Sequence, residues 1–150
     1  MKFAKKALFV IASISLIALA LVACQPAATG PQIEIKEAWG RPSPMQAGNG
    51  AAYMMLENTG SEDDKLISAA SDVSEVVELH DMTMEDDVMK MFHIDAVDIP
   101  AGGSAELAPG GKHVMFIGLH DQLEIGQVVT VTLEFEKSGQ QIIEVEIREP

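Results

Sequence analysis

The feature that most constrains the fold is the succession of short β-forming runs that begins at Gln32. These runs are rich in Val, Ile and Leu, and they are separated by Pro, Gly, Asn, Asp and Ser. No run has convincing helical periodicity. The pattern predicts an all-β domain, a sandwich or Greek-key barrel of eight or nine short strands. We expect strands at residues 33–39, 51–57, 65–70, 76–82, 88–94, 104–107, 113–119, 127–135 and 140–147, with a turn element at 97–103.

The first 24 residues have the layout of a secretion signal. Three lysines precede an apolar stretch at residues 7–21, which ends in Leu21-Val22-Ala23-Cys24. This end resembles the bacterial lipobox, in which cleavage precedes a cysteine that is then acylated. A transmembrane anchor is the alternative, but the apolar run is shorter than the roughly 20 residues that a spanning helix needs. We therefore expect a signal peptide at 1–23, a lipidated Cys24 with a tether at 24–31, and one β domain at 32–150.

Charge and cysteine usage exclude several classes of function. The formal net charge is −13 at pH 7, so nucleic acid is not an expected partner. Cys24 is the only cysteine. If it is acylated, the β domain has no thiol for a disulfide, a zinc ribbon or a nucleophile, which fits an extracytoplasmic protein.

Most of the methionines and three of the four histidines lie between His80 and Met115. Residues 76–82 and 88–94 are expected to form a hairpin in which paired residue numbers sum to 171. In that register Val77 faces Ile94 and Leu79 faces Phe92 toward the core, and Asp81 forms an ion pair with Lys90. The other face pairs His80 with Met91, Met82 with Met89, and Glu78 with His93. Farther along the chain, His113 and Met115 point to one face of another strand.

Imidazole and thioether groups together favour copper. Soft thioethers select Cu(I) over magnesium, calcium or manganese, and imidazole also binds copper well. Zinc prefers cysteine, histidine and carboxylate and rarely uses methionine. Any single methionine here is more often core filler. That reading is kept for Met45, Met54 and Met55. His120, at a strand end, is expected to be an ordinary surface histidine or one satisfied by hydrogen bonds.

The spacing of four of these residues resembles a known family. His80, Met91, His113 and Met115 match the H-x10-M-x21-H-x-M motif of the PCuAC family of periplasmic copper chaperones. The resemblance covers about residues 33–147, and it includes the segments Gly50-Ala-Ala-Tyr53 and Pro109-Gly-Gly-Lys-His113.

The resemblance implies a cupredoxin-like β-barrel that binds Cu(I) through His80, Met91, His113 and Met115. It also implies delivery of copper to the CuA-type site of a respiratory oxidase, often beside a Sco-type thiol protein. The chain would be a non-enzymatic protein anchored by lipid to the bacterial envelope, in the periplasm or on the outer face of the cytoplasmic membrane. We expect it to differ from those relatives that carry a second copper site in a His/Met-rich C-terminal tail, since residues 140–150 contain neither histidine nor methionine.

Other functions stay open at this stage. The same site serves a copper-sequestering resistance lipoprotein, and an adhesion module with a methionine-rich patch is a further alternative. A blue-copper electron carrier needs a cysteine thiolate, and a hydrolase motif such as HExxH is absent from the sequence. Met82, Met84, Met89 and His93 are candidate auxiliary ligands that pass copper to or from the site, with Glu78 orienting His93.

Overall fold

The computed structural model describes residues 29–43 and 48–150. Ten strands occur in these ranges, and they are β1 (Ile33–Gly40), β2 (Asn49–Asn58), β3 (Asp64–Ala70), β4 (Ser74–Glu85), β5 (Val88–His93), β6 (Val97–Ile99), β7 (Ser104–Leu107), β8 (His113–Leu119), β9 (Val128–Phe135) and β10 (Gly139–Ile147). The all-β prediction is therefore confirmed. The expected count was short by one, because residues 97–99 form a strand within the segment predicted as a turn.

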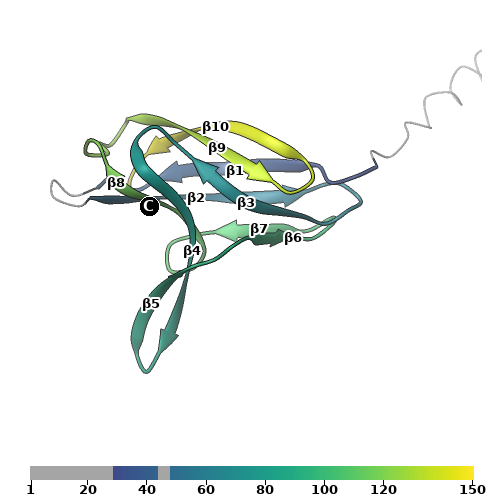
Figure 1. Ribbon diagram of the computed structural model, residues 1–150, viewed down its shortest axis with the longest axis horizontal. Helices are drawn as coiled ribbons and strands as arrows, with labels where there is room; N and C mark the ends of the chain where they lie inside the picture. Colours follow the sequence, from purple (N-terminus) through teal and green to yellow (C-terminus); the bar gives the residue numbers. More distant parts are fainter. Residues whose placement is uncertain (1–28, 44–47) are drawn as a thin grey trace, which may run out of the picture.

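The strands form one sheet in the order β5-β4-β8-β2-β1-β10-β9-β3-β6, with β7 also pairing with β2. All pairings are antiparallel except that of β1 with β10. The sheet curls back on itself, so that β3 comes near β4 and β6 comes near β7. Together they enclose the barrel-like body shown in Figure 1. Within the described residues, no helix is long and apolar enough to cross a membrane.

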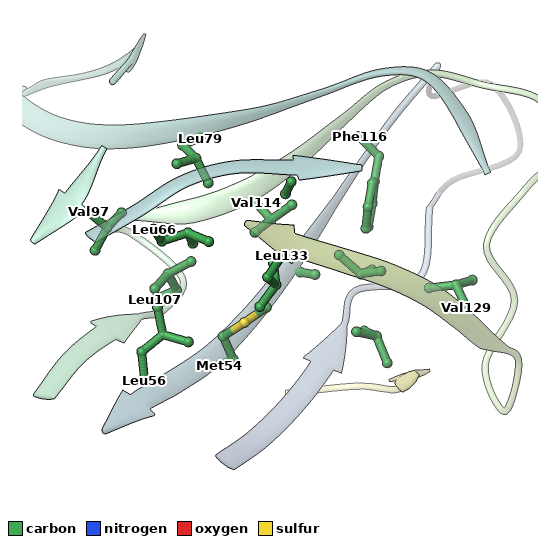
Figure 2. Packing of buried hydrophobic residues seen from close by; sticks show 14 of the residues in the cluster. Met54, Leu56, Leu66, Leu79, Val97, Leu107, Val114, Phe116, Val129 and Leu133 are labelled. Atoms are coloured by element: carbon green, nitrogen blue, oxygen red, sulfur yellow. The ribbon is translucent and has the colours of Figure 1, made fainter. Parts of the chain in front are cut away.

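The core lies inside this curled sheet and follows the alternation of the sequence. In β9 the buried residues are Val129, Val131, Leu133 and Phe135, at every second position. Met54 is buried among aliphatic side chains, as expected for core filler (Figure 2). Met55 is half-buried and His120 is exposed. Met45 falls outside the described residues, as do the predicted signal peptide, Cys24 and most of the tether.

The N-terminal end of the described domain is fixed at Gly30. The backbone amide of Ser61 donates to the Gly30 carbonyl at 3.0 Å. A side chain at Gly60 would lie 2.2 Å from that same carbonyl oxygen, so the close approach needs a glycine. The chain is thus already attached to the domain two residues before Gln32.

The hairpin of β4 and β5 projects from the body of the domain (Figure 1). Its register differs from the prediction by two residues, because Glu85 pairs with Val88 and His80 pairs with His93. Asp86 and Asp87 both have positive φ angles of 50° and 62°. Two such residues make a two-residue type I′ turn, the kind that matches the twist of paired strands. The predicted register would have centred the turn one residue earlier, between Glu85 and Asp86.

The corrected register replaces several predicted pairs. Met91 lies opposite Met82, Met89 opposite Met84, and Phe92 opposite Asp81. The predicted Asp81–Lys90 ion pair is wrong: Lys90 pairs with Glu85, and Asp81 lies 3.9 Å from Lys112. Phe92 is exposed, not in the core, because β5 lies on the projecting hairpin with no sheet beneath it. A shift of two residues preserves the side-chain parity, so the face that carries histidine and methionine is as predicted.

Candidate metal centre

Three histidines form a row across the strands β5, β4 and β8. His80 pairs with His93 on one side and with His113 on the other. The ring centroids of His80 and His93 are 6.1 Å apart, and those of His80 and His113 are 5.9 Å apart. The row exists because directly opposed residues of neighbouring strands present their side chains on the same face.

His80 presents one nitrogen with no protein partner. Its Nε2 lies 2.8 Å from Oε2 of Glu78, two residues earlier on the same face of β4. A carboxylate accepts, so Nε2 carries the proton and Nδ1 holds a lone pair. Among the described residues, Nδ1 of His80 is the buried side-chain nitrogen or oxygen without a hydrogen-bond partner. A buried acceptor is normally satisfied, and a metal ion would satisfy this one.

The ring of His113 is oriented by a hydrogen bond to the backbone. It is buried, and its Nδ1 lies 2.9 Å from the carbonyl oxygen of Gly111. The carbonyl accepts a hydrogen bond from Nδ1–H, which leaves Nε2 as the nitrogen that can bind a metal. Hydrogen bonds of this kind commonly fix the tautomer and the ring orientation of metal-binding histidines. Both imidazoles are therefore held in orientations that leave one basic nitrogen free.

The methionines approach the same place from the two neighbouring strands. A groove of about 250 Å³ beside the histidine row is lined by Met82, Met91, His113 and Met115, together with residues of β2 and the loop after β1. His80 does not line this groove and adjoins it through the ring of His113. The structure thus brings the four predicted ligands to one region and adds Met82.

The remaining predicted residues divide into two groups. His93 belongs to the row but is mostly exposed, with Nδ1 4.0 Å from Asp95. Met84 and Met89 lie farther out on the hairpin and do not line the groove. The predicted role of Glu78 was wrong, because it binds His80 and not His93. The sequence does carry a signal for the contact between Glu78 and His80. The two residues are two apart on one strand, so their side chains point to the same face.

Tyr53 was not predicted as part of this region. Its ring centroid lies 6.3 Å from that of His113 and 4.7 Å from that of Trp39, and Arg148 stacks on Trp39 at 5.5 Å. Tyr53 pairs with Trp39 across β2 and β1, just beyond a bulge at which Glu37 has a φ of 53°. Burial raises the pKa of the Tyr53 hydroxyl, so it stays neutral beside the groove at physiological pH. The aromatic pair therefore forms an uncharged wall that supports His113.

The available donors define what the region can bind. Within residues 29–43 and 48–150, no three His, Cys, Asp or Glu side chains are grouped to hold a metal ion. The predicted donors that lie together in this region are the imidazoles of His80 and His113 and the thioethers of Met91 and Met115. All four donors are neutral, a set that suits a soft ion of low charge better than a hard divalent one.

Comparison with known proteins identifies the family. A family model described as "Putative lipoprotein LpqE-like" matches residues 33–147. The chain belongs to the LpqE-like family. It is 32% identical over 120 residues to a protein of Leifsonia xyli subsp. xyli described as a putative lipoprotein, covering 78% of this chain and 70% of that one. It is 26% identical over 119 residues to an uncharacterized protein of Rickettsia prowazekii, covering 77% of this chain and 66% of that one.

Solved structures place this family member among PCuAC domains. The copper-bound PCuAC domain from PmoF2 matches with a TM-score of 0.68 and 27% identity, covering 82% of this chain and 97% of that domain. The solution structure of CuI-DR1885 from Deinococcus radiodurans matches with a TM-score of 0.62 and 27% identity, covering 83% of each chain. The expected PCuAC-type, cupredoxin-like β fold is confirmed. Both neighbours are described with copper, the first as a copper-bound domain and the second as a Cu(I) form.

Proposed function

We propose that the protein is a lipid-anchored, extracytoplasmic metallochaperone that carries one Cu(I) ion. The ligands we assign are His80 through Nδ1, His113 through Nε2, and the sulfurs of Met91 and Met115. The observation that carries the proposal is the buried, unpartnered Nδ1 of His80 beside a groove lined by the other three residues. The copper-bound PCuAC neighbours support the choice of metal.

The ligand set favours Cu(I) over competing ions. Two imidazoles and two thioethers add no negative charge, so they do not offset the charge of a divalent ion. Zinc sites typically use cysteine, histidine and carboxylate. Cys24 is the chain's only cysteine, so the β domain supplies no thiolate for a blue-copper centre.

The exposure of the site favours delivery over storage. Met91 retains 47% of its surface and lies on β5, the edge strand of the sheet. An acceptor protein can therefore reach the ion and displace one ligand at a time. A sequestering protein would gain from burying every donor. A deletion strain that loses oxidase activity only at low copper supports delivery, whereas sensitivity to excess copper alone would support sequestration.

The cellular setting that we propose follows from the N-terminal sequence and the family. Residues 1–23 would be removed as a signal peptide, Cys24 would carry the lipid, and residues 24–31 would tether the copper-binding domain to the envelope. The putative lipoprotein relative supports this assignment. The acceptor that we propose is the CuA-type site of a respiratory oxidase, with a Sco-type thiol protein as a second partner, on the resemblance to PCuAC chaperones.

The proposal is tested by titrating the domain, residues 29–150, with Cu(I) under anaerobic conditions and recording X-ray absorption. We expect one tightly bound Cu(I) with both nitrogen and sulfur neighbours. A copper environment without sulfur, or no saturable binding, would refute the ligand assignment.

Glu78 gives a separate prediction for the hydrogen bond to His80. Replacing Glu78 with alanine removes the acceptor that keeps the proton on Nε2, so His80 can take either tautomer and rotate. We expect Cu(I) affinity to fall by roughly 10- to 100-fold, the usual effect of losing a group that orients a metal ligand. Competition with a Cu(I) chelator measures the change. Glu75→Ala, on the same strand outside the site, is the matched control; equal affinities for the two variants would contradict the role of Glu78.

A further inference from the structure

The projecting hairpin carries a ladder of four methionines, three of which the four-ligand site does not use. His80 and His93 form its inner rung, Met82 and Met91 the next, and Met84 and Met89 the outermost. All six side chains lie on one face, because they occupy alternate positions on both strands. Successive rungs are about 7 Å apart along the strands. The ladder therefore runs from the hairpin tip to the edge of the histidine row.

Packing does not explain the outermost rung. Met84 and Met89 retain 63% and 50% of their surface, and the hairpin tip has no second layer of sheet beneath it. Exposed strand positions usually favour Thr, Val or aromatic residues. Two methionines placed directly opposite each other at the tip bring two sulfurs within reach of one ion.

The charge around the tip favours a cation. Asp86 and Asp87 form the turn itself, and Glu85 precedes them with Lys90 as its ion-pair partner. The turn therefore adds two carboxylates next to the outermost rung, and neither forms an ion pair within residues 29–43 and 48–150. Such a field raises the local concentration of cations without holding any of them tightly.

We propose that Met84 and Met89 form an outer, weak Cu(I) site that receives the ion and passes it along Met82 and Met91 to the inner site. This inference rests on the proposed function, because it assigns an entry route to the same copper. The ligand class is a soft monovalent cation, Cu(I) or its analogue Ag(I).

The transfer needs no redox partner and no proton. Copper remains Cu(I) throughout, and each step exchanges one neutral thioether for another, ending with neutral imidazole nitrogens. Met91 belongs both to the ladder and to the inner ligand set, so it can hold the ion while an outer sulfur leaves. The increase in the number of fixed ligands from two at the tip to four at the inner site gives the transfer its direction.

The test uses the domain with methionine methyl groups labelled with ¹³C, titrated anaerobically with Cu(I) and in parallel with Ag(I). We expect the first equivalent to shift the methyl signals of Met91 and Met115. A second equivalent should bind about 10- to 100-fold more weakly and shift Met84 and Met89, because two flexible side chains must be immobilised for few contacts. Methyl signals of Met84 and Met89 that stay unmoved with excess metal would overturn the proposal.

A double variant, Met84→Leu with Met89→Leu, preserves the apolar surface and removes both sulfurs. We expect it to keep the first equivalent at unchanged affinity and to lose the second. Met55→Leu, half-buried on β2 and away from the hairpin, should retain both. Retention of the second equivalent by the double variant would overturn the proposal, as would a loss of affinity for the first.

The same titration separates this inference from the proposed function. Wild-type protein that binds no Cu(I) refutes the inner site and the entry route together. Wild-type protein that binds one equivalent through Met91 and Met115, with Met84 and Met89 silent, supports the proposed function and refutes the outer site alone. A purely docking role for the exposed methionines predicts this second result.

Discussion

Replacing His113 with alanine should nearly abolish Cu(I) binding. His113 is the buried member of the histidine row, its ring is fixed through Nδ1, and it alone joins the row to the groove. The variant loses a direct ligand and opens the space between His80 and Met115. We expect an affinity loss greater than the roughly 10- to 100-fold that follows removal of an orienting group. Anaerobic competition against a Cu(I) chelator of known strength measures it.

A smaller change tests the sulfur ligands in the same assay. Met91→Leu keeps nearly the same volume, so it removes the donor atom with little effect on packing. Its affinity should also fall sharply, whereas Met54→Leu, a similar exchange in the core, should bind as the wild type does. Unchanged affinity in both His113→Ala and Met91→Leu would refute the ligand assignment. Thermal unfolding of the metal-free variants shows whether His113→Ala stays folded.

The hairpin that carries Met91 shows what strand alternation in the sequence can and cannot predict. Strand alternation placed His80, Met82, Met89 and Met91 on one face, and it did so correctly although the register was wrong by two residues. The period of a strand is two residues, so such a shift changes the partners and leaves the faces as they were. The composition of the metal-binding face could therefore be predicted, but not which residues oppose each other.

The register error has its origin in turn chemistry. Two-residue hairpin turns need positive φ at both central residues, and their usual signal is Asn-Gly or Asp-Gly. Here Asp86 and Asp87 fill both positions without a glycine. Aspartate tolerates this region of backbone space better than most residues, but less well than glycine. Nothing local in the sequence distinguishes this turn from a longer loop.

The tautomers of the histidines were also beyond sequence reasoning. That Nδ1 of His80 is buried without a partner depends on the sheet order, which places β4 between β5 and β8. Sequence spacing brings Glu78 to the same face as His80, yet it also left His93 as a plausible partner. The observed register decides between these two partners of Glu78, because it places His93 opposite His80 and not opposite Glu78.

Asp64→Asn should destabilise the fold without affecting the metal centre. Asp64 is buried at the start of β3, where it accepts hydrogen bonds from the backbone amides of Lys65, Lys137 and Ser138 and from the Ser138 hydroxyl. An asparagine amide in place of one oxygen would direct a donor at other donors. We expect a loss of about 2–3 kcal/mol at pH 7, measured by urea unfolding. Cu(I) affinity should be unchanged, because Asp64 is hydrogen-bonded to the turn between β9 and β10 and does not line the groove beside the histidine row.

The pH dependence of that difference identifies its cause. Burial alone raises the pKa of the Asp64 carboxyl, but the hydrogen bonds from Ser138, Lys137 and Lys65 outweigh burial and hold the pKa below its ordinary value of 3.8. A lowered folded-state pKa stabilises the fold above the unfolded-state pKa, and that stabilisation is lost as pH falls through the folded-state value. The difference in unfolding free energy between wild type and Asp64→Asn should therefore be constant from neutral pH to about 5 and shrink below about 4.

The control variant Asp98→Asn removes an exposed ion pair with Lys65 and should cost less than about 1 kcal/mol. A gap that persists undiminished at pH 3 would show that lost packing, and not the carboxylate, accounts for the instability.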